Sequence, residues 1–241
     1  MVARWFVTAA LALTASAAWA GPPYLTDDPE PTDTGHWEIY NFTAGTAADG
    51  VLDGAAGLDL NYGPVKGVQL TATAPIDYVR GGGRRRTGFG DLEFGIKYRF
   101  LHDERAGFSM AIFPRAILPT ARSDLGTGRV RLLLPLWAQK DFGPWSIFGG
   151  GGYAINPGAG NRDYLTGGVA LTRHFGERLL IGVEADRQGA DVIGGRASTS
   201  LGVGAIFDLP GPFRLLASGG PTFTDGGGRG FHSFVALGLD F

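Results

Sequence analysis

The residues of this 241-residue chain that could do chemistry are charged side chains at alternate positions within apolar segments. In the segment 91–100, Asp91, Glu93, Lys97 and Arg99 share one face, and the apolar residues between them occupy the other. Charges lining one face can form rings that orient or select a solute. The same charges could instead form ion pairs that fill and brace a narrow barrel. Both interpretations stay open.

Several other segments show the same alternation and add candidates of both signs. A charge that faces lipid near the middle of a membrane costs about 2–4 kcal/mol, so a membrane-crossing strand must turn it toward a lumen. The candidate lumen-facing residues are Asp59, Asp77, Asp91, Glu93, Lys97, Arg99, Arg115, Arg131, Glu184 and Asp186.

Catalytic and metal sites are not indicated. The chain has no Cys, which excludes a thiolate site and a disulfide framework. Of the histidines His36, His102, His174 and His232, none has a Ser two residues later, the spacing that places both side chains on one face of a strand. A partner from a neighbouring strand stays open. We predict no catalytic residue, no metal and no cofactor.

A run of arginines follows Tyr78. Gly81–Gly88 lacks the Gly-Lys-Ser/Thr ending of a phosphate loop. Arg80, Arg84, Arg85 and Arg86 are predicted to lie in a cell-surface loop that meets anionic lipopolysaccharide, and a merely solvated loop is the alternative. The net charge of −2 gives no overall field that would attract nucleic acid.

These side chains need strands to position them, and strands are what the sequence predicts. Glycine is abundant, with 41 residues spread through alternating apolar runs. Twelve segments are long enough to cross a bilayer at a tilt, which needs about 9–11 residues. They are 36–45, 54–62, 66–78, 88–100, 106–119, 129–141, 144–155, 163–174, 178–187, 197–207, 212–222 and 231–241.

The connections alternate between tight turns and longer Gly-rich loops, the latter at 45–53, 79–87, 120–128, 156–162, 188–196 and 223–230. Such alternation is typical of outer-membrane barrels. We therefore predict an all-β fold, a transmembrane antiparallel up-and-down barrel of about 12 strands with both termini on the periplasmic side.

The last segment, Phe231–Phe241, has a period of two that places Phe241, Leu239 and Leu237 on one face. A chain that ends on an aromatic strand residue resembles bacterial outer-membrane proteins, whose barrel-assembly machinery reads such an end. The resemblance implies that Phe241 is an assembly signal.

The start of the chain is predicted to be processed. Residues 1–20 have the charge, apolar core and Ala18-Trp19-Ala20 site of a signal peptide cleaved after Ala20. Residues 21–35 are rich in Pro and acidic residues and are predicted to form an irregular periplasmic segment. A Ca²⁺ site among these acids would lack the ordered spacing of a known loop. The barrel is expected over 36–241.

Three stretches carry a resemblance to a family. They are Thr26-Asp27-Asp28-Pro29 with Gly35–Tyr40, the strand Gly88–Phe100 with its Gly-Phe-Gly-Asp and Lys-Tyr-Arg-Phe ends, and Phe113-Pro114 with Leu118-Pro119-Thr120. They resemble a bacterial outer-membrane family labelled a phenol-degradation meta-pathway protein, over the whole mature chain. The resemblance implies a β-barrel similar to small-molecule channels, and it brings no catalytic residues.

The function expected from all this is passive uptake of a small solute through the outer membrane. If the family label reflects function, that solute is aromatic or otherwise poorly soluble. A structural or surface-interaction barrel with a plugged lumen is the alternative, and an outer-membrane lipid-modifying enzyme is the third. Expected partners are the solute, membrane lipid, lipopolysaccharide and the assembly machinery, but not nucleic acid.

Overall fold

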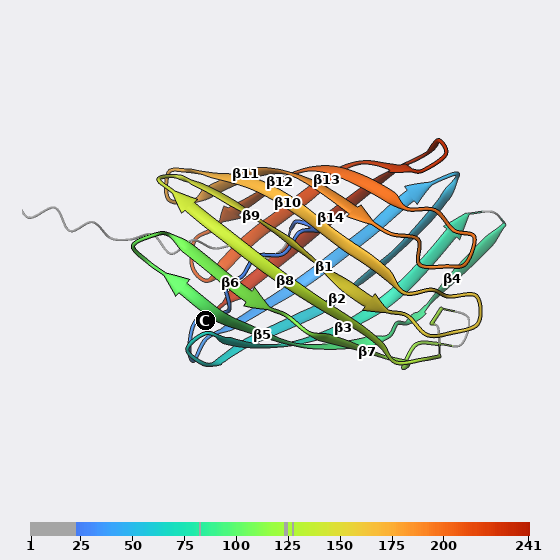
Figure 1. Ribbon diagram of the computed structural model, residues 1–241, viewed down its shortest axis with the longest axis horizontal. Helices are drawn as coiled ribbons and strands as arrows, with labels where there is room; N and C mark the ends of the chain where they lie inside the picture. Colours follow the sequence, from blue (N-terminus) through green and yellow to red (C-terminus); the bar gives the residue numbers. More distant parts are fainter. Residues whose placement is uncertain (1–22, 82, 123–124, 127) are drawn as a thin grey trace, which may run out of the picture.

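The computed structural model describes residues 23–81, 83–122, 125–126 and 128–241, which form one sheet of fourteen strands (Figure 1). The predicted signal peptide lies outside the described residues. The strands are β1 Trp37–Ala48, β2 Val51–Val65, β3 Val68–Gly81, β4 Arg84–Phe89, β5 Leu92–Asp103, β6 Phe108–Ile112, β7 Arg115–Leu118, β8 Arg131–Phe142, β9 Trp145–Ile155, β10 Tyr164–Phe175, β11 Leu179–Gln188, β12 Ser198–Asp208, β13 Phe213–Thr224 and β14 Gly228–Asp240.

The sheet closes into a barrel of twelve antiparallel strands because two of the twelve are interrupted. β4 and β5 both pair with β3 and are separated at Gly90-Asp91. β6 and β7 both pair with β5 and β8 and are separated at Phe113-Pro114, where proline cannot donate to the ladder. β14 pairs with β1 and completes the ring. The predicted twelve-stranded all-β barrel is confirmed.

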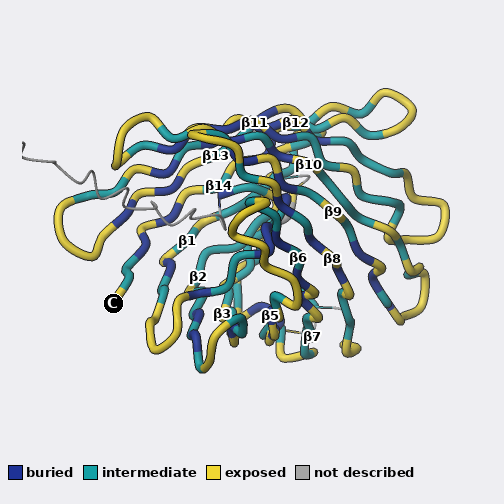
Figure 2. Tube along the Cα trace, turned by 60° about the vertical axis from the view of Figure 1, so that its left-hand side comes forward, coloured by how far each residue is buried: buried dark blue, intermediate teal, exposed yellow. Residues whose placement is uncertain are grey.

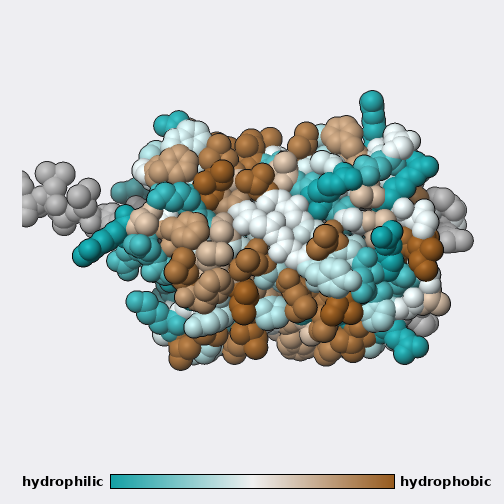
Figure 3. All heavy atoms as spheres, in the orientation of Figure 1, coloured by the Kyte–Doolittle hydropathy of each residue, from teal (hydrophilic) through white to brown (hydrophobic). Residues whose placement is uncertain are grey.

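Residues alternate between an outer apolar face and the lumen along each strand. In β14, Phe231, Val235 and Leu237 are exposed, whereas His232 and Ala236 are buried. The predicted facing of the C-terminal strand is therefore correct. Apolar residues gather along the middle of the outer surface, with hydrophilic residues toward both ends (Figure 3). Such a belt is the surface that a barrel presents to lipid. In the described residues no helix is long and apolar enough to cross a membrane.

The connections differ from the prediction at one end of the barrel. Three of the expected long loops are hairpins, because β1 and β2 are joined only by Asp49 and Gly50, β3 and β4 by residues 82–83, and β13 and β14 by residues 225–227. Asp49 and Gly50 both have positive φ, as a two-residue hairpin turn requires. The remaining long connections are 119–130, 156–163 and 189–197.

The acidic segment before β1 lies inside the barrel rather than outside it. Tyr24, Thr26 and Asp27 contact strands that are 70 to 180 residues away in sequence, and Thr26 and Asp28 are fully buried. Figure 2 shows this irregular chain running through the middle of the ring of strands. We name residues 23–35 the strap. The prediction of an irregular segment holds for it, but its predicted periplasmic position is wrong.

Candidate functional site

The strap begins against the strands of one wall. The Tyr24 hydroxyl donates to the carbonyl of Gly204 at 3.0 Å, and the Tyr24 ring lies edge-on to Phe148 at 6.0 Å. The amides of Leu25 and Thr26 donate to the Glu184 carboxylate at 2.9 and 3.1 Å. Glu184 therefore uses its charge to hold backbone donors that would otherwise be buried without partners.

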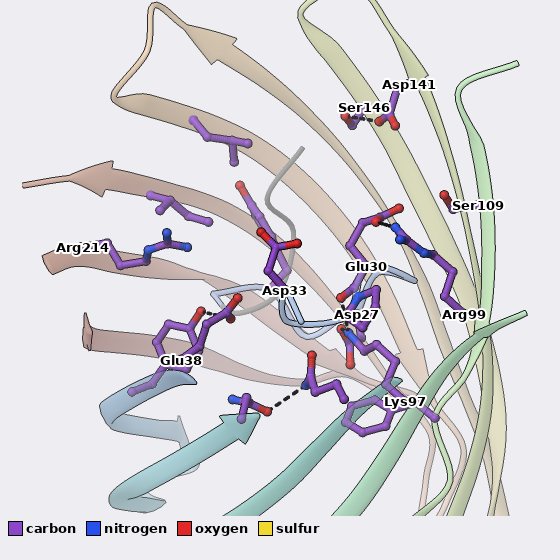
Figure 4. A pocket seen from close by; sticks show the side chains of 18 of the residues that line it. Asp27, Glu30, Asp33, Glu38, Lys97, Arg99, Ser109, Asp141, Ser146 and Arg214 are labelled. Carbon is purple, nitrogen blue, oxygen red and sulfur yellow. Dashed lines mark hydrogen bonds and ion pairs between the residues drawn. The ribbon is translucent and has the colours of Figure 1, made fainter. Parts of the chain in front are cut away.

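The middle of the strap crosses to β5. Lys97 Nζ lies 3.0 Å from Asp27 Oδ1, 3.8 Å from Asp28 Oδ1 and 3.3 Å from the carbonyl of Glu30. Arg99, two residues along the same face, pairs with the Glu30 carboxylate. Figure 4 shows these two cations reaching from β5 to the strap. Two of the four cations predicted to line the lumen are therefore paired with acids of the strap.

The end of the strap joins β2 and β3. The Thr32 amide donates to Gln69 Oε1 at 2.8 Å, and Gln69 donates to Asn61 at 2.8 Å. Gly35 then donates to the Gly63 carbonyl before the chain enters β1. The strap thus spans the lumen from β11–β13, past β5, to β2 and β3.

Glycines on the lumen side of β11 and β12 make room for the strap. A Cβ on Gly182 would lie 2.5 Å from the Tyr24 hydroxyl, and one on Gly204 would lie 2.7 Å from the Tyr24 ring. Both glycines are required by this close approach rather than by barrel curvature. Inward glycines on neighbouring strands, together with Tyr24 in the N-terminal segment, are a sequence signal that could have indicated the strap.

One wall of the lumen is apolar, which the alternation did not predict. Tyr40, Leu180, Ile206, Leu216 and Ala236 form a buried cluster on β1 and β11–β14. Tyr24, Phe42 and Phe234 pack against it. In β1, Tyr40 and Phe42 therefore face the lumen, whereas Trp37 is exposed on the outside.

The opposite wall, on β2–β7, is polar and borders a large cavity. This cavity of about 1190 Å³ opens among the tight turns near Glu104, Pro144 and Glu177. It continues beside the strap along Thr71, Asp59 and Glu93 to Arg115. The cavity therefore passes the level of Lys97 on the polar side of the lumen.

Two ion pairs lie toward the end of the lumen nearest the long loops, and the first of them borders the cavity. Arg115 Nη1 lies 3.3 Å from Glu93 Oε1, and both side chains are 24% exposed. One step toward the long loops, Arg131 lies 3.1 Å from Asp91, which also accepts from the Ala121 amide at 3.0 Å. The connection after β7 is thereby fastened over the Asp91 end of the lumen.

The other predicted lumen residues also fall on the inner face. Asp59 accepts a hydrogen bond from Thr73 at 3.2 Å. Asp77 lies beside Gly90, at the break between β4 and β5. Asp186 lies opposite Ser200, two residues beyond Glu184. All ten predicted residues therefore face the lumen, but the alternation did not indicate that Lys97, Arg99 and Glu184 hold the strap.

The predicted arginine cluster divides between two faces of β3 and β4. Arg80 and Arg85 are exposed and directly opposite each other in the register. Arg86 lies on the other face of β4 and is partly buried. The backbone of Arg84 pairs with Gly81. These residues are in strands, not in a loop, so that part of the prediction is wrong.

A Ser–His pair does occur, on the lumen side. A β-bulge between Arg99 and Leu101 re-aims β5, so that His102 Nδ1 lies 2.9 Å from Ser109 Oγ. His102 therefore lies in β5, which extends beyond residue 100, where the predicted strand ends. The enzyme alternative needed such a pair on the outer wall. The nearest acid, Glu104, is 3.8 Å from His102 Nε2 and 83% exposed.

No group of three or more potential metal-ligating side chains is found among the described residues. Within the strap, Asp27 and Glu30 are paired with Lys97 and Arg99. These contacts leave the two carboxylates engaged by cations of the protein itself.

Comparison with known sequences adds a family. Residues 33–236 match the family described as "Putative MetA-pathway of phenol degradation". The match covers β1 and nearly all of the barrel, up to Ala236 in β14. No curated protein sequence matches the chain.

Comparison with solved structures gives the fold. The COG4313 outer membrane channel from Pseudomonas putida F1 superposes with a TM-score of 0.75 at 15% identity, covering 89% of this chain and 98% of that one. The translocator domain of the autotransporter NalP from Neisseria meningitidis has a TM-score of 0.55 at 14% identity, covering 87% and 89%. The CymD monoaromatic hydrocarbon channel has 0.53 at 8% identity, covering 87% and 89%.

Proposed function

The chain belongs to the family described as "Putative MetA-pathway of phenol degradation", and we propose that it is an outer-membrane channel for passive uptake of a small amphipathic solute. Two of the similar structures are named as channels, and one of these is a channel for monoaromatic hydrocarbons. The proposal gives this chain the same kind of function. Because one fold serves many functions, the proposal rests on the lumen of this chain itself.

The observation that carries the proposal is the two-sided lumen. The cavity of about 1190 Å³ has Tyr40, Phe42 and Phe234 on one side and Asp59, Glu93 and Arg115 on the other. Binding sites for small molecules combine apolar walls with a few placed polar groups. A solute with an aromatic or aliphatic body and one polar group would match both walls. A simple ion or a sugar would use only one.

The strap favours the plugged barrel as a second candidate function. It fills the centre of the lumen and is anchored at Glu184, Lys97 and Gln69. In a channel, solutes pass beside the strap along the polar wall. In a plugged barrel, the strap closes the route and the outer surface carries the function.

Solute flux decides between the two candidates. Purified protein is reconstituted in liposomes, and entry of phenol, benzoate and an equally small sugar is measured. The channel proposal expects faster entry of phenol and benzoate than of sugar, with a further rise when residues 23–32 are deleted. Flux equal to that of protein-free liposomes in wild type and deletion alike would favour the structural barrel.

The proposal assigns the barrel to the outer membrane, following removal of residues 1–20, and gives it no enzymatic role. Ser109 is 2% exposed, and its contact with His102 is treated as wall packing. Incubation with a fluorophosphonate should leave Ser109 unmodified by mass spectrometry. Covalent labelling of Ser109 that is lost in His102→Gln would instead support a hydrolase.

A further inference from the structure

The outer face of the barrel carries a row of side chains at the end opposite the tight turns. Arg85 of β4 lies opposite Arg80 of β3, which lies opposite Leu52 of β2. Leu52 lies opposite Ala47 of β1, which lies opposite Phe231 of β14. All these positions share the outward facing of the exposed Phe231, because side chains in register lie on the same face.

A shallow groove of about 520 Å³ lies along this row. Arg80 borders it on one side and Arg229, two residues beyond Phe231, borders it on the other. Ala47, Asp49 and Leu52 also line it. The groove exists because the hairpin of Asp49 and Gly50 is short and Ala47 has a small side chain.

The arginines along this row differ from several other arginines of the barrel, which are paired with acids. Arg187, also exposed at this end, pairs with Asp225 at 2.7 Å, and Arg131, Arg115 and Arg99 pair with acids inside. Arg80, Arg85 and Arg229 form no ion pair with any described residue. Two like charges directly opposite on a sheet repel each other. The pair Arg80–Arg85 therefore favours an anion from outside the chain.

From this row toward the middle of the barrel, the side chains of the outer face become less polar. One step toward the middle of the barrel, Tyr78 donates from its hydroxyl to the carbonyl of Ala44 at 3.2 Å. One step further, Ile76 and Phe89 are exposed on the outer face, Phe89 at 74%. Cations are thus followed by a polar aromatic ring and then by apolar side chains. This order matches a lipid with an anionic head and acyl chains.

We propose that this groove binds the phosphate groups of a phosphorylated glycolipid of the outer leaflet, lipopolysaccharide. Guanidinium groups recognise phosphate by paired, charge-assisted hydrogen bonds, and two of them on adjacent strands can hold one phosphate. Arg229 is placed to hold a second phosphate across the groove. The acyl chains then lie over Ile76 and Phe89. This site is on the outer wall and does not depend on passage through the lumen.

Binding to the purified barrel tests the proposal. The probes are lipid A with two phosphates, monophosphoryl lipid A, phosphatidylglycerol and inorganic phosphate, with bound lipid measured by native mass spectrometry. The wild type should prefer lipid A with two phosphates. The triple variant Arg80→Gln, Arg85→Gln, Arg229→Gln should bind it at least about tenfold more weakly. Arg187→Gln, at the same end but paired with Asp225, is the matched control and should bind like the wild type.

The variants should fold because the three side chains are exposed, and heat-modifiable mobility on gels verifies this. Should the triple variant fail to fold, Arg80→Gln and Arg229→Gln alone are each expected to weaken binding. The proposal is overturned if the folded variants bind lipid A as tightly as the wild type. It is also overturned if phosphatidylglycerol or inorganic phosphate binds wild type as tightly, since general anion attraction would then explain the groove.

Discussion

Lys97 Nζ lies 3.0 Å from Asp27 Oδ1, and the lysine side chain is only 3% exposed. The contact joins a barrel strand to a segment 70 residues earlier. Asp28 Oδ1 lies 3.8 Å from the same nitrogen. One nearly buried cation on β5 therefore lies against two acids of the strap.

Removing this cation should loosen the strap. Lys97→Gln removes the buried cation that pairs with Asp27, and breaking a buried pair typically costs about 3–5 kcal/mol. We expect a lower thermal unfolding midpoint and a higher conductance in planar bilayers. Lys66→Gln, an exposed change at the β2–β3 turn, is the control. Unchanged stability and conductance in the Lys97 variant would contradict the anchoring role.

A second prediction concerns pH. Burial raises the pKa of Asp28 to about 8, an effect that Lys97 opposes. The unfolded value is about 3.9, so between about pH 4 and pH 8 the folded chain binds more protons at this group than the unfolded chain. The contribution of Asp28 to stability therefore falls as pH rises through that window.

Asp28→Asn keeps a neutral side chain of the same shape and should remove this dependence. The variant should lose less stability than the wild type between pH 5 and pH 9, measured by thermal unfolding in buffers of matched ionic strength. Asp49→Asn, in the exposed β1–β2 turn, should retain the wild-type slope. Parallel slopes for Asp28→Asn and wild type would show that Asp28 is already ionised in the folded barrel.

The twelve strands could be predicted because a barrel wall repeats one local rule. Each strand needs only alternation with lipid outside, and the charges of Glu93 and Asp186 fix which face is inward. The interruptions at Gly90 and Pro114 did not disturb that alternation. The local alternation of residues therefore predicted both the fold and the face on which each side chain lies.

The strap could not be predicted in this way, because its partners are distant in sequence. An acidic, proline-rich segment has the same composition whether water or Lys97 and Arg99 surround it. The apolar wall of the lumen could not be predicted for a related reason. Leu180 and Ile206 occupy inward positions where alternation predicts small or polar residues, and they pack in a cluster that Tyr24 of the strap covers.

Orientation gives a third prediction, which the absence of native cysteine makes easy to test. Ala159→Cys lies in an exposed long connection, and Ala106→Cys lies in an exposed tight turn. If the long connections face the medium, a membrane-impermeant maleimide should label Ala159→Cys on intact cells. Ala106→Cys should react only after permeabilisation. The reverse result would invert the barrel and remove the glycolipid site from the outer leaflet.

A fourth prediction uses variants of Phe241 to separate a role in assembly from a role in strand pairing. Phe241 exchanges two backbone hydrogen bonds with Trp37, at 2.8 and 3.1 Å, and its side chain is exposed. Deleting Phe241 removes both the ring and the pairing, whereas Phe241→Ala removes only the ring. If assembly machinery reads the ring, both variants should yield little heat-modifiable barrel in the outer membrane. Normal assembly of Phe241→Ala would limit the role of this residue to closing the β1–β14 seam.

The last prediction tests passage through the lumen at Glu93 and Arg115. The two side chains pair at 3.3 Å, are equally exposed and border the cavity beside the strap. Because the pair is partly solvated, breaking it should cost only about 0–1 kcal/mol of stability. Glu93→Gln leaves an unpaired cation and should shift reversal potentials toward anion selectivity, while Arg115→Gln should shift them toward cations. Both shifts should shrink between about 0.1 M and 1 M salt, as the screening length falls from about 10 Å to about 3 Å.

The control is Arg173→Gln. Arg173 lies over Trp145 and Phe175, away from the cavity, so this substitution should not change the ion selectivity. Shifts of the same sign in the two lumen variants would place the conducting route elsewhere, and a wild-type barrel without current would defeat the channel.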